Sequence, residues 1–402
     1  MEAETNSGRS WLLIFLMAAF NLFGQPEVSN AALAGKTAAP GSANLSRKEQ
    51  ALNYLAEGET NKNSRAYREA IVSYTNALEL DSSLIAAYIG RAFSKHQLMD
   101  YKSAISDYNA ALKHKLTWEE SYEIHFNKGL SLAALNNLKG AMYDFDYTVR
   151  LKPDNADAYY NRSIVRGMIG DYPGELRDID RVIALRPNDA QAYNSRGIVH
   201  SVMGEYAPAI ADYSKAIALE KTKADAYFNR ALIFFQTKKY LEALKDFNTV
   251  INLRPDAEAY NRRGNVKCRL KDYRGAMDDY NESINMNPND HAAYVNRGQL
   301  KCEMRDYQSA IDDYTEAIKR KPDYSPAYYY RALAKKKLND QKGEIEDLDK
   351  AIEYKPDYEN AYNERGMARY EMGDREGGCD DLNRAVKLGS DAAYSNLIVH
   401  CK

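Results

Sequence analysis

The sequence is poor in cysteine, tryptophan and phenylalanine, and its charges almost cancel. Its four cysteines all lie in the C-terminal third, too few and too one-sided for a disulfide framework. Lys and Arg (55) nearly balance Asp and Glu (57), so no basic field is available to hold a nucleic-acid backbone. No apolar run reaches the length of about 20 residues that a membrane-spanning helix needs.

Tyrosine is the exception among the aromatic residues. The chain has 32 Tyr against 10 Phe and 2 Trp. A tyrosine that recurs at one position of an internal repeat would explain this excess.

The N-terminus resembles an export signal. Residues Trp11 to Phe23 form a mostly apolar run, followed by small-residue cleavage patterns that end at Ala31 and Ala34. We therefore predict a signal peptide over 1–34 and a periplasmic or extracellular protein. The leader is unusually acidic, with Glu2 and Glu4, so an uncleaved membrane anchor at residues 11–23 and a cytosolic protein with a misplaced start remain open.

Residues 35–50 follow this signal. They are rich in Gly, Ala, Pro and Ser at their start, which predicts a flexible linker.

One unit of about 34 residues then repeats ten times over residues 51–391. The expected starts are Ala51, Ile85, Tyr122, Ala156, Ala190, Ala224, Ala257, His291, Ser325 and Glu359. One spacing carries about three extra residues near Trp118 to Ser121, which we assign to a loop between units.

Each unit reads as two helices that turn near its fifteenth position. Position 4 is Tyr in nine units, position 8 is small in all ten, and position 20 is Ala in seven. Position 24 is large, and position 32 is Pro in six units, where it ends the second helix. Small residues at positions 8 and 20 allow the two helices to approach closely.

This pattern, shown almost fully by residues 190–219 (AQAYNSRGIVHSVMGEYAPAIADYSKAIAL), resembles the tetratricopeptide repeat (TPR) in its AYxNRG variant. The resemblance implies an all-α fold, a right-handed superhelical solenoid of antiparallel helix pairs. Residues 392–402 look like the first half of another repeat and are expected to form a C-terminal capping helix.

Opposite charges recur at two positions. Position 7 is Arg or Lys and position 23 is Asp in units two to ten. In an antiparallel pair, positions that sum to about 30 face each other, so we expect an ion pair within each repeat, structural rather than catalytic. Examples are Arg162 with Asp178, Arg196 with Asp212 and Arg230 with Asp246.

Two cysteines near the C-terminus are candidates for a disulfide. Ser390, in the last turn, lies eleven residues from both Cys379 and Cys401, so antiparallel helices bring the two sulfurs to one level. Two buried thiols are the alternative. Cys268 and Cys302 occupy position 12 of neighbouring units, where helices about 8–10 Å apart are too distant for a bridge.

We identify no catalytic residue, no cofactor-binding motif and no metal-ligating set. The paired acids, such as Asp278 and Asp279, are adjacent on a helix and do not face each other. The six histidines show no zinc-type spacing with cysteine.

In the TPR family, positions 2, 5, 9, 12 and 13 of the first helix line a concave groove that binds partner segments. In units two to six this groove is expected to be apolar, whereas units seven and eight are more polar. The expected groove residues are Ile89, Phe93, Phe126, Leu130, Tyr160, Ile164, Ile198, Phe228, Leu232 and Phe235. The alternative is that these side chains pack on neighbouring first helices or on the chain's own linker.

The resemblance implies a non-enzymatic scaffold or adaptor that holds an extended or helical apolar segment of another protein. A regulatory or accessory subunit of an envelope enzyme or assembly complex is the alternative, and an enzyme with a cryptic site stays open. Binding of nucleic acid is disfavoured by the repeat spacing and the near-neutral charge.

Overall fold

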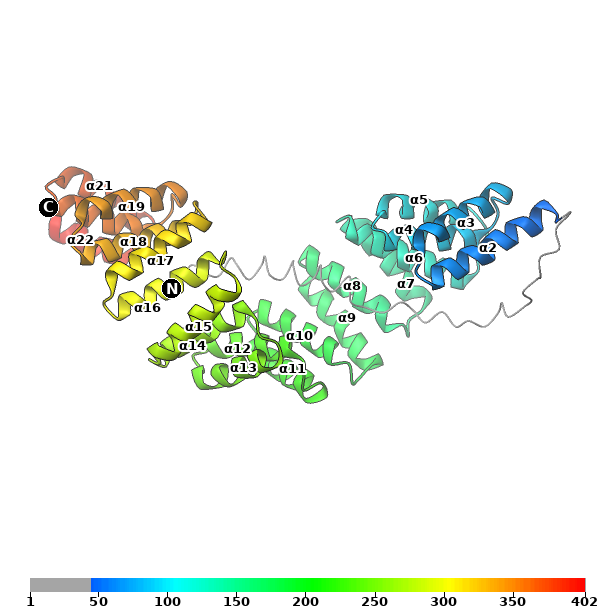
Figure 1. Ribbon diagram of the computed structural model, residues 1–402, viewed down its shortest axis with the longest axis horizontal. Coiled ribbons are helices and arrows are strands. Elements are labelled where there is room, and N and C mark those ends of the chain that lie inside the picture. The colour runs from blue at the N-terminus through cyan, green and yellow to red at the C-terminus, as the bar shows by residue number, and fades with distance from the viewer. Residues whose placement is uncertain (1–44, 402) are drawn as a thin grey trace. The chain divides into compact units, whose positions relative to one another are not determined.

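The computed structural model describes residues 45–401, which form successive helices and contain no strand (Figure 1). The predicted signal peptide and residues 35–44 of the predicted linker lie outside the described residues. The chain divides into two compact units, residues 1–219 and 220–402, and each is described by itself.

The first compact unit holds five helix pairs. Within a pair the two helices pack on each other, and each second helix also packs on the first helix that follows it in this unit. The helices are α2 (Arg47–Asn63), α3 (Tyr67–Leu80), α4 (Ile85–Gln97), α5 (Tyr101–Ala111), α6 (Trp118–Ala134), α7 (Leu138–Leu151), α8 (Ala156–Ile169), α9 (Tyr172–Leu185), α10 (Ala190–Val202) and α11 (Tyr206–Leu219).

The second compact unit continues the pattern with five more pairs and ends with α22, which packs on α21. The helices are α12 (Ala224–Gln236), α13 (Tyr240–Leu253), α14 (Ala257–Arg269), α15 (Tyr273–Met286), α16 (His291–Glu303), α17 (Tyr307–Arg320), α18 (Ser325–Lys337), α19 (Gln341–Tyr354), α20 (Glu359–Glu371), α21 (Arg375–Lys387) and α22 (Asp391–His400).

Most first helices begin at the repeat starts read from the sequence, but α2 and α6 begin four residues earlier. Each of these two helices starts at a capping box. The side chain of Ser46 accepts a hydrogen bond from the Glu49 backbone N–H, and the Glu49 side chain accepts one from the Ser46 backbone N–H. Thr117 and Glu120 form the same two bonds. Two expectations were therefore wrong: residues 47–50 belong to a helix rather than the linker, and residues 118–121 form the first turn of α6 rather than a loop.

Contact between the helices of a pair depends on the residue at position 8. A Cβ atom placed on Gly197 would lie 2.7 Å from the ring of Tyr213, which occupies position 24 of the same pair. Gly264 and Tyr280 repeat this relationship at the same distance. The large buried ring thus leaves room only for a small residue opposite it, which explains why large and small residues recur together.

A residue in the left-handed region ends the first helix of every pair. It falls at position 15, so that Gly204 has φ +79° and Lys271 has φ +63°. The next residue often caps the second helix, as where the Asp272 side chain accepts from the Gly275 N–H. The other residues in this conformation at position 15 are Arg65, Met99, Asn136, Gly170, Lys238, Arg305, Asn339 and Gly373.

Candidate functional site: the first-helix face

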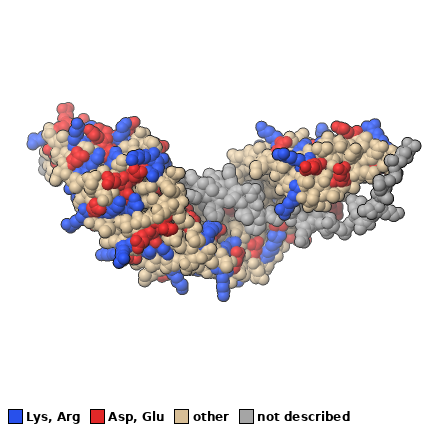
Figure 2. All heavy atoms as spheres, in the orientation of Figure 1, with Lys and Arg blue, Asp and Glu red and all other residues tan. Residues whose placement is uncertain are grey.

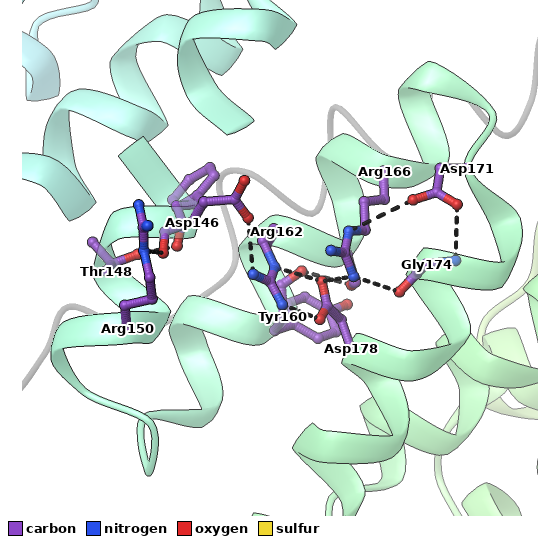
Figure 3. Close-up of polar contacts among 11 residues, drawn as sticks. Asp146, Thr148, Arg150, Tyr160, Arg162, Arg166, Asp171, Gly174 and Asp178 are labelled. Atoms are coloured by element: carbon purple, nitrogen blue, oxygen red, sulfur yellow. Dashed lines mark hydrogen bonds and ion pairs between the residues drawn. The ribbon is translucent and has the colours of Figure 1, made fainter. Parts of the chain in front are cut away.

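An ion pair joins the two helices of most pairs. The Arg162 guanidinium donates from Nε and Nη2 to the two oxygens of Asp178, at 2.9 and 2.6 Å (Figure 3). Asp178 is buried, with 2% of its surface exposed, so the two parallel bonds replace its lost hydration. The same paired bonds link Arg196 to Asp212 and Arg230 to Asp246. They recur in Arg91–Asp107, Arg263–Asp279, Arg297–Asp313, Arg331–Asp347 and Arg365–Asp381.

The same arginine also reaches the preceding pair, which the sequence analysis missed. Arg162 Nη1 donates to Asp146 Oδ1 at 2.9 Å, as Figure 3 shows, and Arg196 Nη1 donates to Asp180 at 2.7 Å. These acceptors stand at position 25, which is polar in most units. Each guanidinium therefore fixes the register between successive pairs as well as within one.

A second base at position 11 completes the network around several of the buried aspartates. Arg166 Nη1 lies 2.9 Å from Asp178 Oδ2 and donates to the Gly174 carbonyl at 2.9 Å. Lys267 and Lys301 make the equivalent contact with their own aspartates at 2.8 Å. Because these aspartates are buried between cations and helices, the network orients the helices relative to one another.

The surface made by successive first helices is called here the first-helix face. In the first compact unit, α2 packs on α4, α4 on α6 and α6 on α8. In the second, α14 packs on α16, α16 on α18 and α20 on α22. Side chains at positions 2, 5, 9, 12 and 13 of neighbouring first helices therefore lie beside one another on this face.

Four of the ten expected groove residues belong to the core instead. Ile89, Phe126, Tyr160 and Ile164 have 3–8% of their surface exposed, so a partner cannot reach them. Ile89, for example, packs in a buried cluster with residues of α5 and α6. For these four, the expectation of a groove role was wrong, because residues of neighbouring helices cover them.

The other six groove residues are half-buried, so part of each side chain remains exposed. Phe228 lies with its ring 5.6 Å from Phe247, and Phe235 lies 5.7 Å from Tyr240, so both rings are held in place. The half-buried residues are Phe93, Leu130 and Ile198 in the first compact unit and Phe228, Leu232 and Phe235 in the second.

Units seven and eight, expected to be polar, satisfy many of their polar groups internally. The Asn296 amide donates to Asn261 Oδ1 at 2.8 Å, which links α16 to α14, and the Tyr280 hydroxyl donates to Asn265 at 2.7 Å. Cys268 and Cys302 are half-buried free thiols, and burial raises the pKa of both.

Two buried glutamates were also missed, although the repeat pattern marked them. Position 20 is Ala in seven units, but Glu175 and Glu344 occupy it in α9 and α19 and are 8% and 1% exposed. Burial raises the pKa of Glu175 to about 8, with a further contribution from Asp171. Burial raises the pKa of Glu344 to about 7, and Lys336 opposes that shift.

The C-terminal helix is tied to its neighbour by a disulfide. Cys379 on α21 and Cys401, just after α22, are bridged, with Cα atoms 5.7 Å apart. The bridge fixes the end of the helix stack, where α22 has no following helix in the described chain.

Residues 45–401 contain no cluster of His, Cys, Asp or Glu arranged to hold a metal ion. None of the helices in this range is both long and apolar enough to cross a membrane. On the face shown in Figure 2, acidic and basic side chains are interspersed rather than gathered into one area of like charge. A surface of this kind does not favour a nucleic-acid backbone.

Family models of tetratricopeptide repeats match this chain in several places. A model described as "TPR repeat" matches residues 202–238, and models described as "Tetratricopeptide repeat" match 97–156, 224–256, 257–290 and 295–359. Together the matches extend over more than half of the chain.

A curated relative, RNA polymerase II-associated protein 3 from Xenopus laevis, is 30% identical over 114 residues. The match covers 28% of this chain and 16% of the relative, so this chain spans about a sixth of that protein.

Among solved structures, the match to yeast Tom70 covers 88% of this chain and 88% of the Tom70 chain, at 14% identity and a TM-score of 0.48. The Cut9–Hcn1 structure covers 88% of this chain and 90% of the other at 12% identity and a TM-score of 0.48. YrrB, described as a TPR protein with an unusual peptide-binding site, covers 46% of this chain and 95% of its own at 22% identity and a TM-score of 0.39. The repeated helix pairs and the family matches show that this chain belongs to the tetratricopeptide repeat family.

Proposed function

We propose that this protein is a non-enzymatic scaffold that binds a segment of another protein on its first-helix face. TPR proteins generally mediate protein–protein interactions. The observation that supports this role here is the set of six half-buried apolar side chains on the first-helix face, held in place by the packing around them. Partly exposed, rigidly placed apolar residues are the usual anchors of a protein interface.

The spacing of these anchors suits an extended segment. Phe93 and Leu130 both stand at position 9, on the adjacent first helices α4 and α6. Adjacent helices are about 8–10 Å apart, and an extended chain advances about 3.3 Å per residue. A bound segment would therefore advance by about three residues from one first helix to the next.

The test places a photo-crosslinking amino acid at Phe93, Leu130 or Leu232 in the host cell. Val72, Tyr143 and Leu241 are matched controls on second helices, where they are 60%, 63% and 69% exposed. We expect mass spectrometry to identify, for each compact unit, a partner segment that is crosslinked from its first-helix positions and absent from the controls. Equal crosslinking from both sets would contradict binding at this face.

Phe126 is unsuitable for this test because it is a core residue, 3% exposed and 6.1 Å from Phe145 between ring centroids. Any substitution of Phe126 would disturb the packing of the helices and could abolish binding through local unfolding.

We also propose that the protein is exported, on the basis of the apolar run Trp11 to Phe23 and the small residues after it. N-terminal sequencing of the protein from the host envelope should give a chain that begins after Ala31 or Ala34. A chain that retains residues 11–23 in the membrane fraction would favour the anchor, and recovery of the full chain from the cytosol would contradict export.

A further inference from the structure

Three tyrosines gather on the first-helix face of α18 and at the start of α20. The Tyr329 ring lies 4.9 Å from that of Tyr358 and 5.3 Å from that of Tyr330, between centroids. The repeat pattern accounts for Tyr328 at position 4 but not for tyrosines at both positions 5 and 6, which no other unit has. Tyr329 remains half-buried, so part of its ring is open to a ligand.

Glu364 lies near the Tyr329 ring and belongs to a group of glutamates around one lysine. Lys336 Nζ on α18 lies 2.8 Å from Glu364 on α20 and 3.7 Å from Glu344 on α19. Glu371, exposed on α20, is also close enough to raise the pKa of Lys336. A single ammonium therefore contacts two carboxyl groups, and Glu371 adds a third negative charge nearby. We call Tyr329, Tyr330, Tyr358, Lys336 and the three glutamates the Tyr–Glu cluster.

One carboxyl oxygen in this cluster is left without a hydrogen bond. Glu344 is 1% exposed, and its Oε1 accepts no hydrogen bond from the described residues, although it points toward Lys336. A buried acceptor that lacks a donor is costly, and Lys336, the cation nearest to it, is shared with Glu364. The cluster therefore has more carboxyl groups than its one lysine can satisfy.

These features select the chemistry of a ligand. Carboxylates repel acidic peptides and phosphates. A metal ion is disfavoured, because the described residues contain no metal-type cluster and Lys336 occupies the centre. An organic cation suits both parts of the cluster, since ammonium and guanidinium groups bind carboxylates and stack on tyrosine rings. Lys355 already places its Nζ 4.6 Å from the centre of the Tyr358 ring.

We propose that the Tyr–Glu cluster binds a basic side chain, preferably arginine, from the partner segment that lies on the first-helix face. Glu364 and Glu371 accept hydrogen bonds from the cation, and Tyr329 offers its ring. Arginine is preferred because its planar guanidinium can stack and form paired bonds at once. This inference rests on the proposed function and assigns one position of the bound segment.

The test selects peptides from a phage-displayed library of random dodecamers on the full chain and measures the affinity of one selected peptide by fluorescence anisotropy. We expect the selected peptides to share an arginine or lysine. Replacement of a shared arginine by citrulline, which keeps the shape and removes the charge, should weaken binding by about tenfold or more.

The matching protein variant is Glu364→Gln with Glu371→Gln, and its control is Glu316→Gln with Glu353→Gln, which removes two charges from the second helices α17 and α19. The first variant should weaken the arginine peptide by about tenfold and leave the citrulline peptide unchanged, because the two changes remove one interaction. The control should affect neither peptide. Circular dichroism checks that each variant is folded.

Two results would overturn the inference, and they differ in what they say about the proposed function. Peptides that bind without a basic residue, or an arginine peptide that is indifferent to the glutamate variant, would overturn the cation site and leave the scaffold role standing. Failure to recover any peptide that binds the full chain would overturn both.

Discussion

Arg230 and Asp246 form an ion pair of the network in a helix pair that has no base at position 11. Arg230 Nε and Nη2 donate to the two carboxylate oxygens at 2.7 and 2.8 Å, and Asp246 is 3% exposed. In this helix pair position 11 holds Phe234 rather than a base, so no second cation reaches Asp246 from that position. The energetic role of the position 7–23 contact can therefore be measured here with least interference.

Asp246→Leu should lower the free energy of unfolding by about 3 kcal/mol, because it leaves a half-buried guanidinium without its countercharge. The double variant Arg230→Met with Asp246→Leu should recover most of that loss, since an apolar pair needs no desolvation of charge. Urea unfolding followed by circular dichroism measures both. The exposed pair Arg254–Asp225 is the control, and Asp225→Asn should cost under about 1 kcal/mol. A double variant as unstable as the single one would contradict this account.

The stability of the α8–α9 pair should depend on pH through Glu175. Folding raises the pKa of this carboxyl from 4.5 to about 8, so the folded protein holds the proton more tightly than the unfolded chain does. The contribution of the Glu175 carboxyl to the free energy of unfolding is therefore fully present below pH 4.5. It is lost as the pH rises toward 8, at up to roughly 1.4 kcal/mol per unit of pH.

Glu175→Ala tests this pH dependence and restores the alanine that seven units carry at position 20. We expect the variant to gain stability over the natural chain at pH 8 and to lose most of that advantage at pH 5, by urea midpoints. The exposed residue Glu79 supplies the control Glu79→Gln. An advantage of the same size at both pH values would show that packing, and not titration, is responsible.

The period of 34 residues was enough to place most helices, because the small residue at position 8, the turn at position 15 and the large residue at position 24 recur in each unit. It was not enough for α2 and α6, where Ser46 and Thr117 extend the helix by one turn. Their capping boxes, Ser46 with Glu49 and Thr117 with Glu120, were visible in the sequence but lie outside the repeat pattern.

The candidate site was harder to predict for a different reason. A helical face read from one unit says which side chains point the same way, but not which of them a neighbouring helix covers. Ile89 and Phe93 lie on one face of α4, yet Ile89 is buried and Phe93 is half-buried. The contact of Arg162 with Asp146 likewise depends on the register between two pairs, which no single repeat contains.

The disulfide between Cys379 and Cys401 should leave two free thiols in unreduced, denatured protein, those of Cys268 and Cys302. Reduction, or Cys401→Ser, should destabilise the attachment of α22 by about 3 kcal/mol, because the bridge closes a loop of 21 intervening residues. Hydrogen exchange of the α22 amides should then accelerate while that of α14–α17 stays constant. Four titratable thiols in freshly isolated protein would contradict the bridge.

A substitution at a turn residue of position 15 is expected to stabilise the protein, unlike the loss of the disulfide. Lys271 has φ +63°, a conformation that costs a residue with a Cβ atom about 1 kcal/mol relative to glycine, and units four, five and ten carry glycine there. Lys271→Gly should raise the free energy of unfolding by a few tenths to about 1 kcal/mol, the relief of strain being partly offset by the greater freedom of glycine in the unfolded chain. Gly204→Ala, at φ +79°, should lower it by about 1 kcal/mol. Urea midpoints compare the two variants, and a loss of stability in Lys271→Gly would show that the lysine side chain stabilises the turn by more than its backbone conformation costs.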